Sequence, residues 1–167
     1  RTHTCGELSK KNEGKEVKLS GWVHKRRDLG GLIFVDLRDK YGITQVVFHP
    51  DKVKDFSVAE SLKYEFVVKV TGTVASRDSK NVNKDLSTGE IEIEVNEVEV
   101  LSKAKVMPFE IFESKKGEED EELRLKYRYL ELRREKLKNN ILFRAKAEKY
   151  IRDYMDSRGF VHIATPL

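Results

Sequence analysis

The chain has 167 residues, of which 38% are hydrophobic and 37% charged, and its formal net charge is +4. This composition is typical of a globular protein with an ionic surface and excludes a disordered chain. Apolar runs such as residues 31–35 are far shorter than the roughly 20 residues of a membrane span, and a single cysteine, Cys5, excludes an internal disulfide. We therefore expect a cytoplasmic protein that makes no membrane contact.

The first half of the chain shows the period of two that is expected of half-buried strands. Residues 16–24 alternate in this way and predict a first strand, followed by a turn at residues 25–31, which end in two glycines. Residues 32–37 predict a second strand, and residues 43–48 predict a third that ends before Pro50. The three strands are expected to form a meander.

Apolar residues at helical spacing over residues 51–62 predict a short amphipathic helix, and residues 64–76 and 90–101 predict two long strands. Three strands, a helix and two strands are the order of an all-β OB-fold, a five-stranded Greek-key barrel. A five-stranded SH3-like barrel or an open sheet would show similar alternation. The helix between the third and fourth strands favours the OB-fold.

The remaining residues predict a different kind of structure. Residues 104–117 contain Pro108 and predict a linker, and the acidic residues 118–122 predict the start of a basic helix with Leu123, Tyr127 and Leu130 at helical spacing. Residues 137–158 predict a long helix that ends at Gly159, before a strand over residues 160–165. We expect domains at residues 1–103 and 137–167, joined by a linker and hinge helix at 104–136.

No catalytic constellation is visible in the sequence. The four histidines lie on separate predicted elements without metal-ligand spacing, and the chain lacks a phosphate-binding loop, a dinucleotide fingerprint and a nucleophile elbow. We therefore expect no catalytic residue and no bound metal within residues 1–167.

The first three strands of an OB-fold form the face that receives single-stranded nucleic acid. Arg26 and Arg27 close the first predicted strand, Phe34 is central in the second, and Gln45 lies in the third. They could neutralise phosphates, stack on a base and pair with a base edge. In the alternative interpretation, Phe34 is a core residue and Gln45 an exposed polar residue. Residues 25–27 and 124–138 are the densest basic segments, and either could instead be an ordinary solvated face.

Several longer motifs occur in an order that resembles bacterial aspartyl-tRNA synthetases over nearly the whole chain. They are residues 1–6 (RTHTCG), 21–28 (GWVHKRRD), 34–39 (FVDLRD), 88–92 (TGEIE) and 125–134 (LKYRYLELRR). The lysyl and asparaginyl enzymes share the same domain plan and remain alternatives, as does a free-standing OB-fold module that binds single-stranded RNA. Residues after 124 argue against the free-standing module.

The resemblance implies roles for individual residues in reading an anticodon. Phe34 would stack on the central uridine, Gln45 would hydrogen-bond to it, and Arg27 would support the same loop. Glu92 would accept hydrogen bonds from a guanine at the first anticodon position. The residues implied as further loop contacts are Arg77, Asn81 and Asn83.

The resemblance also implies what the parent enzyme does. Residues 159–166 look like the start of the motif with which class II synthetases form homodimers, although Ala164 and Glu135 stand where the family usually has Glu and Pro. The parent would be an aspartate–tRNA ligase, which activates L-aspartate with ATP and Mg²⁺ to aspartyl-adenylate and transfers it to tRNA(Asp). Its catalytic residues would lie beyond Leu167. Leu29 and Lys80 favour an enzyme that discriminates against tRNA(Asn).

Overall fold

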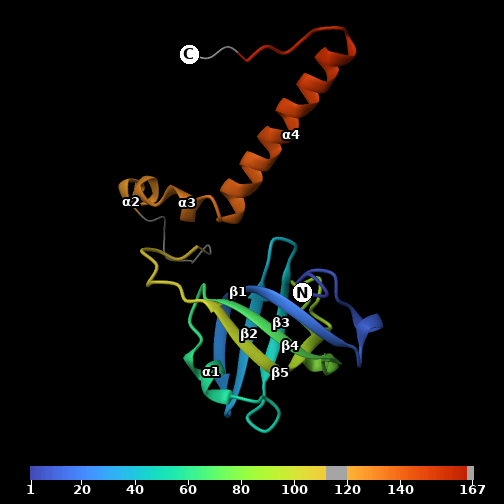
Figure 1. Cartoon of the computed structure of the whole chain (residues 1–167), viewed down its shortest axis with the longest axis vertical. Helices are drawn as coiled ribbons and strands as arrows, with labels where there is room; N and C mark the ends of the chain where they lie inside the picture. The colour runs from blue at the N-terminus through green and yellow to red at the C-terminus, as the bar shows by residue number, and fades with distance from the viewer. Residues whose placement is uncertain (112–119, 165–167) are drawn as a thin grey trace. The chain divides into compact units, whose positions relative to one another are not determined.

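A computed structural model of the chain describes residues 1–111 and 120–164 (Figure 1). The chain divides into two compact units, Arg1–Lys105 and Val106–Leu167. The predicted linker end at Gly117, the first acidic residue Glu118, and Thr165 and Pro166 lie outside the described residues.

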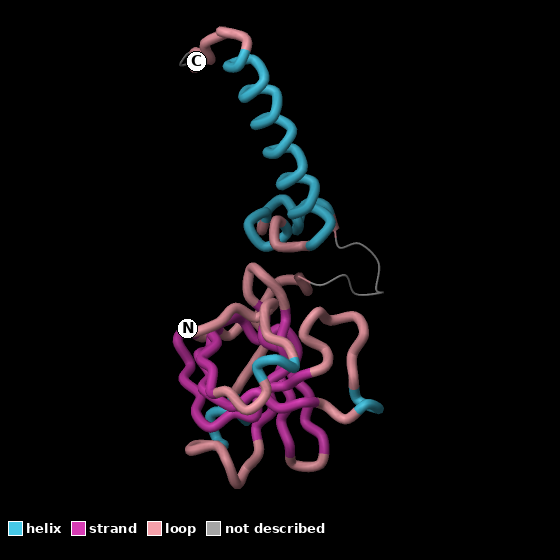
Figure 2. Tube along the Cα trace, turned by 90° about the vertical axis from the view of Figure 1, so that its right-hand side faces the viewer, coloured by secondary structure: helices cyan, strands magenta, loops and turns pink. Residues whose placement is uncertain are grey.

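The first unit is a closed barrel whose strands are ordered β1-β2-β3-β5-β4, and Figure 2 shows them wrapped around a common centre. The strands are β1 (Glu16–Leu29), β2 (Leu32–Arg38), β3 (Ile43–Phe48), β4 (Val67–Ser76) and β5 (Ile91–Ser102). Neighbouring strands are antiparallel except β3 and β5, which are parallel. Closure leaves no long unpaired edge in the barrel. This is the arrangement that the strand order in the sequence predicts.

Alternation along the strands separates the core of the barrel from its outer face, except in β3, where residues 44–48 are all buried. In β2, Ile33, Val35 and Leu37 are buried, whereas Phe34 and Asp36 between them are partly exposed. The other strands contribute their own buried alternate residues, which include Val17, Leu19, Val23, Val46, Phe48, Val68, Val70, Val74, Ile91, Ile93 and Val95. Burial of this apolar surface is the main force that holds the barrel together.

Strand β1 is longer than the alternation predicts. Residues 25–28 continue the strand instead of forming a turn, and the turn consists of Gly30 and Gly31, both with positive φ (62° and 82°). A two-residue turn of this kind matches the twist of the flanking strands and favours glycine. The prediction of a turn over residues 25–31 was wrong because charged residues at a hairpin tip can remain paired with the neighbouring strand.

The helix predicted over residues 51–62 is shorter. Helix α1 spans Phe56–Ser61, and Asp55 caps it by accepting a hydrogen bond from the backbone N–H of Ser57. Residues 51–54 form turns before this cap. A short 3-10 helix, η1 (Lys10–Asn12), precedes the barrel, and a second, η2 (Ser79–Asn81), lies between β4 and β5.

In the second unit, the predicted basic helix is divided into α2 (Glu121–Lys126) and α3 (Arg128–Glu131). The chain leaves helical geometry at Tyr127, whose φ and ψ are −107° and 43°. The helices pack on the preceding linker in a small apolar cluster that contains Phe109, Ile111 and Leu130, with Leu123 and Tyr127 against it. The apolar positions were therefore predicted well, but the continuity of the helix was not.

Helix α4 (Glu135–Ser157) corresponds to the long predicted helix and is followed by Gly159 with φ 83°. Residues 160–164 have no regular secondary structure, so the strand predicted there was wrong in its described part. A strand requires a neighbour to satisfy its backbone hydrogen bonds, and none of the described residues pairs with this segment. No helix of the described residues is long and apolar enough to cross a bilayer.

Close backbone approach in the barrel generates a first prediction. A Cβ atom added to Gly72 would lie 2.2 Å from the backbone oxygen of Glu94. We expect Gly72→Ala to lower the free energy of unfolding by about 1–3 kcal/mol, since backbone cannot move aside as a flexible side chain can. The control is Thr71→Ala, on the outer face of the same strand. Urea unfolding followed by the fluorescence of Trp22, the single tryptophan, measures both; equal midpoints would contradict the steric argument.

Candidate nucleic-acid interface

The outer face of β1, β2 and β3 brings Arg27, Phe34 and Gln45 together. Arg27 pairs with Phe34 across β1 and β2, and Asp36 pairs with Gln45 across β2 and β3. Directly paired residues lie on the same face of a sheet. Phe34 is outside the core cluster and partly exposed, so the alternative interpretation of Phe34 as a core residue is wrong. Gln45 is buried, with 9% exposure, so it is not the exposed polar residue of that interpretation either.

Polar side chains on this face form one connected network. Arg27 Nη2 donates to Asp36 Oδ1 at 2.8 Å and to Gln45 Oε1 at 3.0 Å. Gln45 Nε2 donates to Glu92 Oε2 at 3.0 Å, and Arg77 Nε lies 3.5 Å from the same oxygen. We call these five residues the Gln45 network. Its two arginines and two carboxylates balance, and the exposed Lys25 lies opposite Asp36 on the same face.

Glu92 differs from the acidic residues on either side of it. Glu90 is paired with Lys10 and Glu94 with Lys52, and these are exposed or partly exposed ion pairs of the kind that covers many protein surfaces. Glu92 instead contacts an amide and a guanidinium and is only 24% exposed. It faces outward, as simple alternation requires, but it is not an ordinary solvated carboxylate.

Arg77 lies just after β4 and is only 5% exposed. Burial lowers its pKa, while the charges of Glu92 and Asp36 oppose that shift. Arg77 Nη1 also lies 3.4 Å from the backbone oxygen of Asn81. The Asn83 side chain is used within the loop, since its Oδ1 accepts from the backbone N–H of Asp85. Of the three predicted loop contacts, only Arg77 joins the Gln45 network.

Arg26 does not share this face with Arg27. It pairs with Val35, whose side chain is in the core, and its guanidinium lies 3.6 Å from Asp28 on the same side of the strand. The prediction that placed Arg26 and Arg27 together at the end of one strand is corrected by this register. A β-bulge between Val23 and Lys25 sets which of the two arginines faces outward.

A second polar cluster lies next to the bulge. Arg38 Nη2 donates to both carboxylate oxygens of Glu65, at 2.9 and 3.0 Å, and Arg38 Nη1 lies 3.1 Å from His24 Nδ1. Glu65 is buried and has a positive φ of 63°. Burial, followed by the positive charges of Arg38 and Lys25, lowers the pKa of His24 from 6.5 to about 4. The ring is therefore neutral at pH 7 and accepts from Arg38.

The predicted basic segment at residues 124–138 is partly neutralised within the second unit. Arg124 and Arg128 both contact the buried carboxylate of Glu131. Arg134 donates to the backbone oxygen of Glu110 at 2.7 Å and stacks over the ring of Phe109. These arginines stabilise the packing of linker and helices, so a count of basic residues overstates the charge available to phosphates.

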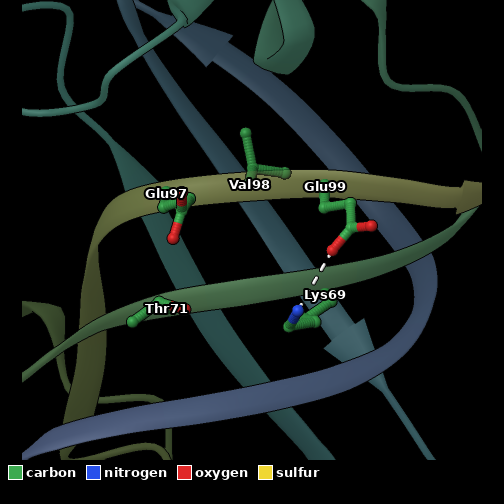
Figure 3. A pocket seen from close by; sticks show the side chains of 5 residues that line it. All are labelled: Lys69, Thr71, Glu97, Val98 and Glu99. Atoms are coloured by element: carbon green, nitrogen blue, oxygen red, sulfur yellow. Dashed lines mark hydrogen bonds and ion pairs between the residues drawn. The ribbon is translucent and has the colours of Figure 1, made fainter.

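The rest of the described surface shows no comparable candidate site. Figure 3 shows a pocket on β4 and β5, where Lys69 Nζ and Glu99 Oε2 are 3.1 Å apart beside Thr71, Glu97 and Val98. None of the sequence motifs falls there. Within residues 1–111 and 120–164, no group of three or more His, Cys, Asp or Glu side chains is placed to hold a metal ion. We assign none of the described residues a reaction step.

The barrel and its polar outer face define a nucleic-acid-binding class. Residues 17–101 match the family described as OB-fold nucleic acid binding domain, and the chain belongs to that family. Residues 120–167 match class II tRNA synthetases of the D, K and N type. The OB-fold prediction is confirmed.

Individual relatives narrow the resemblance further. The chain is 53% identical to an aspartate–tRNA(Asp/Asn) ligase of Rubrobacter xylanophilus over 167 residues, which are 100% of this chain and 28% of the relative. The resemblance to aspartyl-tRNA synthetases is thereby confirmed. The chain spans little more than a quarter of the length of this relative.

Two solved structures share the fold over 99% of this chain. An asparaginyl-tRNA synthetase from Pyrococcus horikoshii, complexed with asparaginyl-adenylate, has a TM-score of 0.80 at 27% identity, and the match covers 36% of it. An aspartyl-tRNA synthetase from Entamoeba histolytica has a TM-score of 0.83 at 23% identity, with 39% of it covered. At that identity the second likeness shows the fold alone.

The low pKa of His24 predicts an acid-sensitive barrel. In the unfolded chain His24 takes up a proton near pH 6.5, but in the folded chain only near pH 4. Between these values the unfolded state binds more protons, so the free energy of unfolding falls as the pH falls. Since the ring is partly exposed, we expect a loss of roughly 1 kcal/mol between pH 7 and pH 5.

The control for this prediction is His24→Gln, which keeps a neutral acceptor for Arg38 but cannot take up a proton in this range. Urea midpoints at several pH values measure both proteins. A decline of the same size in the Gln variant would assign the acid sensitivity to other groups.

Proposed function

We propose that this chain reads the anticodon loop of tRNA(Asp) as part of an aspartate–tRNA ligase. The observation that carries the proposal is the combination of a partly exposed Phe34 with the charge-neutral Gln45 network beside it. An aromatic ring binds an unpaired base by stacking, and an amide flanked by charged groups can pair with its edge. Because the charges of the network balance, it attracts phosphates less than a surface of unpaired arginines would, which favours contact with bases.

Each predicted reader has a distinct role in this proposal. Phe34 stacks on the central uridine, Gln45 pairs with that base, and Arg27 supports the loop. Glu92 reads a guanine at the first anticodon position. Both contacts of Glu92 within the network use Oε2, so Oε1 and the second lone pair of Oε2 can accept from the base. Arg77 supports Glu92 from beneath, while Arg26, Asn81 and Asn83 are outside the network and contact RNA at its margin.

The complete protein would attach L-aspartate to tRNA in the cytoplasm, using ATP and Mg²⁺ through an aspartyl-adenylate. The chemistry is then carried by residues beyond Leu167. Helix α4 presents exposed apolar side chains, among them Ile141, Phe143 and Ile151, and would pack within the catalytic domain and its homodimer. The alternatives of a lysyl or asparaginyl enzyme, or of a free-standing RNA-binding module, are less well supported by the relatives.

The range of tRNA substrates depends on two exposed positions. The name of the Rubrobacter relative includes tRNA(Asn) as well as tRNA(Asp). Leu29 lies at the tip of the β1–β2 hairpin, and Lys80 lies in η2. We propose that any restriction to tRNA(Asp) acts through Leu29 and Lys80 and does not act through the Gln45 network.

Stacking by Phe34 is tested by Phe34→Ala in the 167-residue chain. We expect binding of an anticodon stem-loop of tRNA(Asp) to weaken by about 1–3 kcal/mol, the usual worth of one stacked base. Fluorescence titration measures the Kd. Tyr64→Ala, which removes an exposed aromatic elsewhere on the barrel, is the matched control and should bind normally. Unchanged binding by the Phe34 variant would show that the ring does not stack.

Base selection by Glu92 is tested by Glu92→Gln. A carboxylate accepts from both N1–H and N2–H of guanine, whereas the Gln amide places a donor against them. We expect the preference for guanine at the first anticodon position to fall by about 1–3 kcal/mol, with little change in the salt dependence of binding. Glu94→Gln on the same strand is the control. The measurement is the Kd of each protein for stem-loops with G, A or U at that position. An undiminished guanine preference in the Glu92 variant would count against the assignment.

A further inference from the structure

The side-chain amide of Gln45 is held from both ends. Its Oε1 accepts from Arg27 Nη2 at 3.0 Å, and its Nε2 donates to Glu92 Oε2 at 3.0 Å. The reversed amide would turn its N–H groups toward the guanidinium and its oxygen toward the carboxylate. Neither pair can form a hydrogen bond, because an arginine has no acceptor and a carboxylate has no donor. The two charged neighbours therefore permit one orientation.

A fixed orientation leaves the amide with one free donor and one free acceptor in a set order. Nε2 has a second N–H, and Oε1 has a second lone pair. Uracil and cytosine differ in the order of these groups on the pairing edge. Uracil has a donor at N3 and an acceptor at O4, whereas cytosine has an acceptor at N3 and a donor at N4. An amide that cannot rotate accepts one order and rejects the other, but an amide that can rotate accepts both.

Glu92 holds the Nε2 end of the amide, and the Oε1 end depends on Arg27, which is 38% exposed and lies near the hairpin tip. A long side chain in that position would otherwise sample several rotamers or turn toward a phosphate. Asp36 prevents this, since its Oδ1 lies 2.8 Å from the same Nη2 atom that contacts Gln45. Asp36 is 14% exposed and lies directly opposite Gln45 in the β2–β3 register.

We propose that Asp36 is a positioning residue that sets the choice of Gln45 between uracil and cytosine, acting through Arg27 and without contacting RNA. The proposal rests on the proposed function of anticodon reading and adds a residue to it. A carboxylate in this position would repel phosphate, so its value to an RNA-binding face lies in restraining the cation beside it.

The test uses the 167-residue chain and two stem-loops of tRNA(Asp) that differ only in U or C at the central anticodon position. Asp36→Asn keeps the size of the side chain but removes the charge that holds Arg27. We expect the ratio of the two Kd values to fall by about tenfold, the worth of one well-formed base contact. The matched control is Asp28→Asn, which removes a carboxylate on the opposite side of β1 and should leave the ratio unchanged.

A second measurement separates positioning from a general structural effect. In a Gln45→Ala background, Asp36→Asn should not change the ratio, because the group through which it acts is gone. If Asp36→Asn fails to fold, Arg27→Lys takes its place. An ammonium lacks the planar fork of the guanidinium, so this variant should also lower the ratio of the two Kd values.

The outcomes separate the two proposals. If the unmodified chain binds neither stem-loop, the proposed function and this inference both fail. If it prefers U and the Asp36 variant keeps that preference, or weakens binding of both stem-loops equally, only the positioning role is overturned. A change in the ratio that persists in the Gln45→Ala background overturns it as well.

Discussion

One extra residue in β1 determines which side chains the barrel presents. The register passes from Val23 opposite Leu37 to Lys25 opposite Asp36, so His24 is inserted between them. Without this bulge, alternation would place Arg26 opposite Phe34 and turn Arg27 toward the core. The contact of His24 with Arg38, which in turn holds Glu65, fixes the insertion. The pairing of Arg27 with Asp36 and Gln45 depends on it.

The charged side chains of the Gln45 network on the outer face neutralise one another. A surface of unpaired arginines would bind any phosphate, and a surface of unpaired carboxylates would repel RNA. In the Gln45 network each charged group has a partner of opposite charge, and a neutral amide lies between them. Hydrogen-bonding groups in such a network are already oriented before a ligand arrives, which reduces the entropy lost on binding.

Alternation and turn residues predicted the five strands and their order, because burial on one face of a strand leaves a period of two in the sequence. Register leaves no such trace, so the sequence did not reveal the bulge at His24 or the separation of Arg26 from Arg27. Asp36 was not predicted as part of the network, since an acidic residue at an outward-facing position of a strand resembles any exposed residue. A strand was predicted over residues 160–165, but its formation depends on a neighbour to pair with.

The division of each strand into inward and outward residues has a consequence for how such a protein can evolve. Mutations at Phe34 or Asp36 alter the partly exposed face without removing apolar volume from the core cluster, whereas mutations at Ile33 or Val35 do the reverse. Ligand recognition and stability of the fold therefore depend on different residues, which alternate along the same strands. A lineage can explore new ligands along one set of residues while selection for a folded chain continues to act on the other.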